Sequence, residues 1–159
     1  MMYMDPLAFG LAYSGAVLAV LGGAVGSSLG LRASTRTGAA VIGEDIKQAR
    51  NVIILASLPM TQTFYGLIVT LLIITRVNSL YGSIELDKGL FTFTVGLMVG
   101  LAELFSAWFQ GLTCASGIAE LTRTRGAITF NAIILAVYLE LIGIMGMVSG
   151  IIFSSLVLG

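Results

Sequence analysis

The chain has 159 residues, of which 57% are hydrophobic and 10% are charged, and its formal net charge at pH 7 is zero. A soluble domain is about 25% charged, so this composition indicates a membrane protein with several spans and excludes an ordinary water-soluble domain. No basic tract is present, which argues against a nucleic-acid partner, and one cysteine without any histidine excludes an internal disulfide and a zinc cluster.

Four long apolar segments follow one another along the chain, at residues 7–31, 52–75, 90–119 and 128–158. Each is long enough to cross a bilayer as a helix, which takes roughly 20 apolar residues. Membrane strands would alternate in hydropathy and run for only about 10 residues. The sequence therefore predicts an all-α membrane protein with four transmembrane helices. Part of the connection at residues 32–51 is expected to continue the first helix beyond the membrane.

Basic residues are unevenly shared among the three connections. Six of the eight lie in the first and third connections: Arg32, Arg36, Lys47, Arg50, Arg123 and Arg125. Because cytoplasmic loops are enriched in Lys and Arg, both hairpin loops are predicted to face the cytoplasm, with both termini outside. No basic residue precedes Arg32, so no cleaved signal peptide is expected.

The two halves of the chain resemble each other. Aligning residues 65–69 with residues 145–149 gives an offset of 80 residues, half the chain. We therefore divide the chain into two tandem helical hairpins, residues 1–80 and 81–159. In this register Met60 occupies the position of Glu140, so the first hairpin lacks the carboxylate that the second carries.

The first apolar segment carries a ridge of small residues at four-residue spacing, formed by Gly22, Gly26 and Gly30. Small residues allow membrane helices to approach closely, so ordinary tight packing is one interpretation. A weaker version of the ridge occurs within residues 107–115. Two such ridges on the leading helices of two repeats favour a narrow inner ring built from these helices.

One carboxylate, Glu140, stands near the middle of the last apolar segment. A charged residue at mid-membrane costs about 2.5–3.5 kcal/mol on insertion scales. The plain interpretation is a buried, protonated glutamate bonded to a neighbouring helix. Since intramembrane carboxylates usually mark an ion or proton path, Glu140 is the leading candidate for a functional residue.

The second apolar segment presents a polar face to its neighbours. The side chains of Leu58, Thr61, Gln62 and Tyr65 share this face by the three-and-four spacing of a helix. Pro59 has no N–H group and loosens the local hydrogen-bond ladder. Backbone carbonyls near Leu58 could therefore turn toward a ligand.

Gln110, in the third apolar segment, adds a second amide. With Glu140, Gln62, Thr61 and a loosened carbonyl it would form an oxygen-rich site with one negative charge. Hard cations take oxygen ligands, and one carboxylate suits a monovalent ion better than calcium. The alternative is a set of unrelated interhelical hydrogen bonds, each worth about 0.6 kcal/mol.

The pattern Leu-Pro-x-Thr-Gln-x-x-Tyr-Gly at residues 58–66, the Gln-Gly pair at 110–111 and Glu140 resemble the ion-binding motif of a known family. This family is the proteolipid rotor subunit (K or c-type) of bacterial V-type rotary ATPases, in its sodium-translocating branch, and the resemblance covers the full chain. It implies that identical subunits form a closed ring in the plasma membrane of a bacterium, surrounded by lipid. It also implies contacts with central stalk subunits and with a stator subunit that carries an arginine.

The resemblance further implies a subunit that is not an enzyme by itself and has no organic cofactor. The ring would carry Na+ (or H+) across the membrane as it turns, driven by ATP hydrolysis in a soluble head. A ring with one carboxylate per four helices moves fewer ions per turn. Fewer ions per ATP allow a pump to work against a steeper gradient, so we favour pumping over synthesis. The Na+ ligands carried over from the motif are the carboxylate of Glu140, the side chains of Gln62, Gln110 and Thr61, and the carbonyl of Leu58. Tyr65 would bond the glutamate and close the site.

Two residues depart from the motif. Met60 replaces a glycine, and Glu103 is a second carboxylate in the third apolar segment. Glu103 lies two turns from Gln110, about 10 Å along the helix axis, so both cannot touch one ion. It could be a protonated structural residue, an entry-path group or a charge facing the ring lumen, and we favour the structural role.

Two other classes of protein remain as alternatives. A small four-helix secondary transporter could use Glu140, but the residues beside it are aliphatic and small where an aromatic-lined cavity would be expected. A structural membrane protein without transport would leave the Gln and Glu set unexplained.

Overall fold

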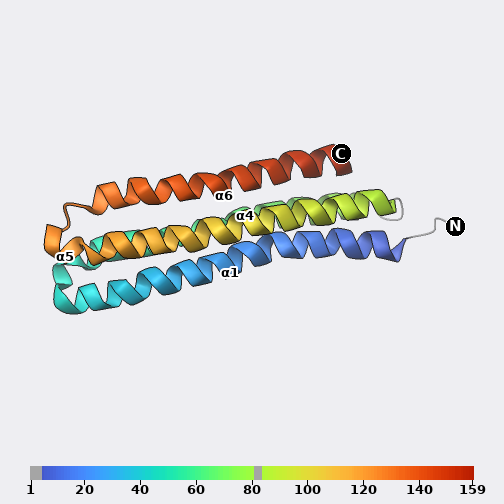
Figure 1. The fold of residues 1–159 in the computed structure, drawn as a ribbon. Helices are drawn as coiled ribbons and strands as arrows, with labels where there is room; N and C mark the ends of the chain where they lie inside the picture. Colours follow the sequence, from blue (N-terminus) through green and yellow to red (C-terminus); the bar gives the residue numbers. More distant parts are fainter. Residues whose placement is uncertain (1–4, 81–83) are drawn as a thin grey trace.

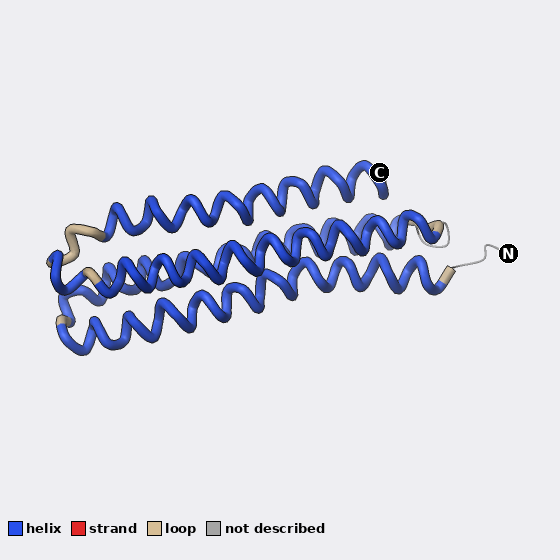
Figure 2. Tube along the Cα trace, viewed as in Figure 1, coloured by secondary structure: helices blue, strands red, loops and turns tan. Residues whose placement is uncertain are grey.

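The computed structural model describes residues 5–80 and 84–159, and nearly all of them are helical (Figure 2). The first helix is α1 (Pro6–Glu44). The second span is built from a 3₁₀ turn at Ile46–Gln48, α2 (Ala49–Ser57), a 3₁₀ turn at Leu58–Met60 and α3 (Thr61–Ser79). The second half comprises α4 (Leu86–Ala119), the short α5 (Leu121–Thr124) and α6 (Thr129–Leu158).

Within the described ranges, four helical spans are long and apolar enough to cross a membrane, at Pro6–Glu44, Ile46–Ser79, Leu86–Ala119 and Thr129–Leu158. The predicted all-α architecture with four membrane helices is therefore confirmed. The helices run antiparallel along one bundle (Figure 1). The turns at Asp45 and at residues 120–128 share one end, the loop end, whereas α1 starts and α6 finishes at the other end.

The packing order places α4 between α1 and α6, and α3 contacts all three. α1 meets α4 through the glycine ridge. A Cβ atom added to Gly22 would overlap the backbone of Gly100, and one added to Gly26 would overlap the backbone of Leu104. The ridge thus brings two helices of the same chain into backbone contact, while the expectation that it lines an inner ring stays a prediction.

The connection predicted at residues 32–51 is shorter in the structure, because α1 continues to Glu44. This extension packs on α2. The Ser34 hydroxyl donates to the Ala56 carbonyl at 3.2 Å, and Gly38 faces the side chain of Val52. The helix ends at Glu44. Asp45 follows with an extended backbone, and its side chain accepts a hydrogen bond from the Lys47 amide, so the chain reverses there. The expectation that part of the connection stays helical is confirmed.

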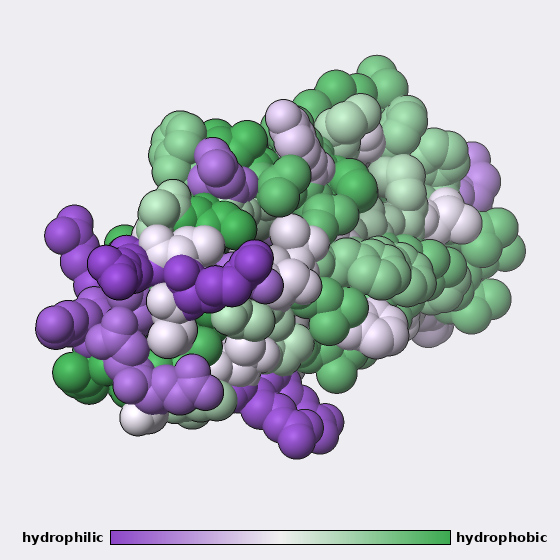
Figure 3. All heavy atoms as spheres, turned by 60° about the vertical axis from the view of Figure 1, so that its left-hand side comes forward, coloured by the Kyte–Doolittle hydropathy of each residue, from purple (hydrophilic) through white to green (hydrophobic). Residues whose placement is uncertain are grey.

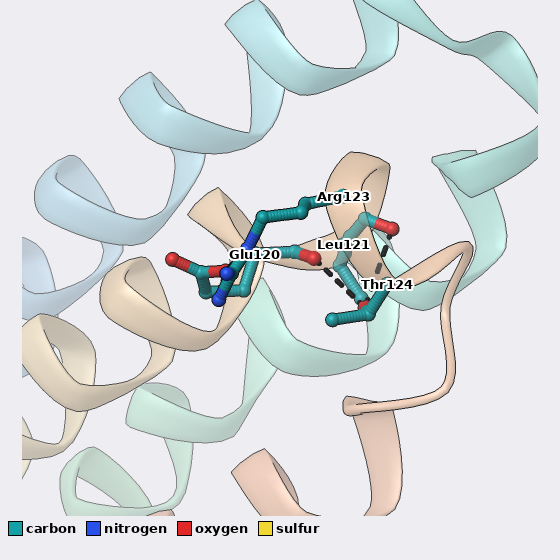
Figure 4. Close-up of polar contacts among 4 residues, drawn as sticks. All are labelled: Glu120, Leu121, Arg123 and Thr124. Carbon is teal, nitrogen blue, oxygen red and sulfur yellow. Dashed lines mark hydrogen bonds and ion pairs between the residues drawn. The ribbon is translucent and has the colours of Figure 1, made fainter.

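The other turn at the loop end is held by local polar contacts, shown in Figure 4. Arg123 forms an ion pair with Glu120 at 2.5 Å, and the Thr124 hydroxyl donates to the Glu120 carbonyl at 2.8 Å. Arg125 and Gly126 then take positive φ values of 52° and 83°. This left-handed pair lets the chain turn back into α6 within a few residues.

The face seen in Figure 3 is apolar along most of the bundle, and hydrophilic side chains gather on it toward the loop end. Exposed large side chains such as Phe64, Leu135 and Met145 fit contact with lipid or another apolar surface. The buried apolar residues form two clusters. One contains Val69, Ile73 and Val99, and the other, nearer the loop end, contains Leu55, Ile118 and Ala136. A belt of buried polar residues separates them.

Candidate ion-binding site

The site begins where the second span changes its helical pitch. Pro59 lacks an N–H group, so it cannot bond the carbonyl four residues earlier, and the chain tightens into the 3₁₀ turn at Leu58–Met60. The Leu58 carbonyl accepts from both the amide and the hydroxyl of Thr61, the latter at 3.2 Å. This carbonyl therefore lies beside the Thr61 hydroxyl rather than being free. The side chain of Met60 is 45% exposed on the bundle surface.

The amide of Gln62 connects α3 to α4. Its side chain is 0% exposed. The nitrogen Nε2 donates to Gln110 Oε1 at 2.8 Å and to Ser106 Oγ at 3.1 Å. The oxygen Oε1 accepts from the Thr61 hydroxyl at 3.2 Å. With both ends of the amide bonded, Gln62 is held in one orientation in the centre of the bundle.

Glu140 receives a hydrogen bond on each carboxylate oxygen, from two different helices. The Tyr65 hydroxyl of α3 donates to Oε1 at 2.8 Å, and Gln110 Nε2 of α4 donates to Oε2 at 3.1 Å. The same Gln110 nitrogen also donates to the Ala136 carbonyl at 3.2 Å. The half-buried carboxylate is thus fixed by neutral donors, which orient the charge without cancelling it.

The electrostatic balance of this site is unusual for a membrane interior. The ion pair found in the described ranges joins Arg123 and Glu120 at the loop end, so no described cation pairs with Glu140. Charged groups in hydrocarbon are normally paired or neutralised. No group of three or more acidic, Cys or His residues capable of holding a metal is present among residues 5–80 and 84–159. A site with one carboxylate and several neutral oxygens suits a monovalent cation.

The structure therefore joins five of the sequence-predicted residues in one hydrogen-bonded network. Its members come from three helices, α3, α4 and α6, and are Thr61, Gln62, Tyr65, Gln110 and Glu140. The Leu58 carbonyl lies at its edge, through Thr61.

Sequence reasoning missed Ser106, which is 1% exposed. It accepts from Gln62 and donates to the Leu139 carbonyl at 2.7 Å. Its position four residues before Gln110 places both on one helix face, and this spacing is the signal that could have found it.

Glu103 is not hydrogen-bonded to this network. Its side chain is fully buried and points across to α6, where Gly143 and Gly146 leave room for it. Neither carboxylate oxygen has a hydrogen-bond partner, whereas Glu140 has one on each oxygen. The side chain is enclosed between helices of its own chain, and the structural role expected from the sequence stays a prediction.

Comparison with known proteins gives two findings. The family of the ATP synthase C-subunit matches the chain twice, at residues 14–73 and 93–153, once in each half. The A-type ATP synthase subunit K of Methanocaldococcus jannaschii is 29% identical over 149 residues, which is 94% of this chain and 63% of the relative. The chain thus spans less than two thirds of the length of that relative.

Proposed function

This chain belongs to the ATP synthase C-subunit family, and we propose that it is a rotor subunit that carries Na+ across a membrane as part of a turning ring. The observation that carries this proposal is the environment of Glu140. A single half-buried carboxylate is held by Tyr65 and Gln110 among apolar helices, and no cation of the described residues pairs with it. Such a group is ready to bind a transported cation that supplies the missing charge.

The proposed ligands are oxygens of the hydrogen-bonded network that includes this carboxylate. Glu140 provides the charge, and the carbonyls of Gln62 and Leu58 with the Thr61 hydroxyl provide neutral oxygens. Gln110 presents its nitrogen to Glu140 here. To serve as a ligand its amide would turn by half a rotation, so that the carbonyl oxygen faces the ion.

Rotation would be gated by the charge state of the site. A bare carboxylate cannot face lipid cheaply, whereas one neutralised by a cation and fully hydrogen-bonded can. Each Glu140 would load an ion at one half-channel of a stator subunit, cross the lipid and unload at another. An arginine of that stator would displace the ion. Tyr65, bonded to Glu140, would close the site during the passage.

The remaining parts of the proposal concern the assembly. Identical chains would form the ring, with central stalk subunits at the loop end and lipid around it. ATP hydrolysis would take place in a separate soluble head, so this subunit is not an enzyme by itself and needs no organic cofactor. The membrane would be the plasma membrane of a bacterium, with the loop end in the cytoplasm, where its basic residues favour it. We favour pumping over synthesis because the chain holds one such site for four helices.

Labelling with a hydrophobic carbodiimide tests the proposal. The reagent attacks the protonated acid, so Glu140 is expected to react and Na+ or Li+ to protect it. Modification sites would be located by mass spectrometry of the digested chain, with Glu140→Gln as the unreactive control. Protection that follows pH alone, with no effect of Na+ or Li+, would assign proton transport. An unlabelled Glu140, with labelling at Glu103 that Na+ or Li+ prevents, would show that the site is misplaced.

The two glutamines offer a test of selectivity. Gln62→Leu and Gln110→Leu keep the side-chain size, and each should weaken Na+ binding by about 1.5–3 kcal/mol, which is roughly tenfold or more. The reason is that each removes a neutral oxygen and leaves its hydrogen-bond partners unpaired. Binding of radioactive Na+ to the purified assembly at alkaline pH measures the change.

Thr63→Val is the matched control for the glutamine variants, because the Thr63 hydroxyl bonds Ser27 and lies outside the network. Its Na+ affinity should equal that of the unmodified chain. Unchanged affinity in both glutamine variants would mean that the amides only join helices.

A further inference from the structure

Glu103 is a buried carboxyl residue that the proposed mechanism does not use. It is 0% exposed, and both of its carboxylate oxygens lack a hydrogen-bond partner. An ionised carboxylate without donors is among the most costly groups to bury. The charge on Glu103 must therefore be removed by something that the side chain itself binds.

The surroundings of Glu103 define what it can bind. From α6, Gly143 and Gly146 face it, and a Cβ added to Gly143 would lie 2.7 Å from Oε2 of Glu103. The hydroxyl oxygen of Ser106 lies 3.0 Å from the same added atom. The two polar groups therefore share the space that the missing side chain of Gly143 leaves open.

The charged and titratable groups that act on Glu103 are few. Glu140 on α6 and Tyr65 on α3 lie within electrostatic range, and neither can carry a compensating positive charge. The ion pair of the described chain lies far away at the loop end, so it offers no compensating cation. A metal ion would need several oxygen ligands. Besides Glu103 itself, the atoms nearest to this space include one side-chain oxygen, that of Ser106, and the two glycines add none. The ligand that this space accommodates is a proton.

We propose that Glu103 is a resident proton-binding site, and that its carboxylic acid donates to Ser106 and so positions Gln62 for the transported ion. Ser106 already donates to the Leu139 carbonyl and accepts from Gln62, and a hydroxyl oxygen has a second lone pair to accept from Glu103. Ser106 lies three residues after Glu103 on the same face of α4. A rotation of the Glu103 side chain therefore brings its O–H group toward the Ser106 hydroxyl oxygen.

The hydrogen bonds from Glu103 to Ser106 and from Gln62 to Ser106 connect the proton site to the ion site. Ser106 fixed by Glu103 holds Nε2 of Gln62, which keeps Oε1 of Gln62 turned toward Thr61. Glu103 is thus a positioning residue that never touches the ion. This second part rests on the proposed function, whereas the proton site itself does not.

Infrared spectroscopy tests the proton site without any sodium measurement. In the Glu140→Gln variant, Glu103 is the buried carboxyl group that remains among the described residues. At neutral pH this variant should still show the absorption band of a protonated carboxylic acid, because carboxylic acids in contact with water are in general ionised at this pH and do not contribute to that band. The band should disappear when Glu103→Gln is added and persist when the exposed Glu85→Gln is added instead. Absence of the band from Glu140→Gln would overturn the proposal.

Sodium affinity tests the positioning role. Glu103→Met cannot donate to Ser106, so Na+ binding should weaken roughly fivefold or more. Glu103→Gln supplies an N–H donor of similar size and should rescue most of that loss. Ser106→Ala interrupts the same path with a smaller residue and should match Glu103→Met, which keeps the test available if the methionine variant does not fold. Equal affinity in the unmodified chain, Glu103→Met and Ser106→Ala would overturn the positioning role and leave the proton site standing.

Discussion

Replacing Glu140 with glutamine is expected to abolish Na+ binding to the purified assembly and with it any ion-coupled turnover. The substitution keeps the shape of the side chain, and the new amide can accept from Gln110 through its oxygen and donate from its nitrogen to the Tyr65 hydroxyl oxygen, so the bundle should assemble normally. It removes the negative charge that would compensate a cation at this site. Losing one partner of a buried charge pair costs about 3–5 kcal/mol, which is at least a hundredfold in affinity.

Radioactive Na+ binding across a range of sodium concentrations measures this effect directly. Glu120→Gln is the matched control, because it neutralises a carboxylate at the loop end, where Glu120 pairs with Arg123. That variant should bind Na+ as the unmodified chain does. Retained Na+ affinity in Glu140→Gln would contradict the assignment of the charge-carrying ligand.

Replacing Gly26 with leucine is expected to prevent the chain from accumulating as a stable assembly. Gly26 meets the backbone of Leu104 on α4, and even a Cβ atom finds no space there. Overpacking against side chains costs about 1–3 kcal/mol, and a backbone cannot move aside as a side chain does, so a larger loss is expected. Because both helices belong to one chain, the defect should arise in the fold of the single chain before any ring forms.

Gly10→Leu is the control for this experiment, since a Cβ atom at Gly10 meets nothing within 4 Å and lies on the same helix. The yield and the mass of the intact, detergent-extracted assembly would be compared for the two variants. A symmetric ring of normal size from Gly26→Leu would remove the argument from the glycine ridge.

Much of the fold follows from hydropathy alone, because each of the four spans must cross a bilayer. The residues at which the helices begin and end cannot be predicted from hydropathy in the same way. Hydropathy marks where the bilayer core of about 30 Å ends. The 39 residues of α1 measure about 58 Å, and the polar part beyond residue 31 stays helical because Ser34 and Gly38 pack on α2.

The candidate site was less completely predictable. Helical spacing placed Thr61, Gln62 and Tyr65 on one face, and the structure brings this face against Gln110 and Glu140. Spacing along a helix says nothing about how α4 is rotated against α6. The roles of Ser106 and Glu103 depend on that rotation, and on two glycines of α6 whose importance becomes clear only once Glu103 is seen between them.

The start of α1 and the end of α6 lie at the same end of the bundle (Figure 1). A second copy fused after α6 would therefore enter the bilayer in the same orientation as the first, with only a short linker between them. Gene fusion can thus lengthen such a chain hairpin by hairpin without inverting any part of it. The same geometry permits concatemers in which one copy in two, or one in three, carries Glu140→Gln. The spacing between working carboxylates around an assembly would then become a quantity that the experimenter sets.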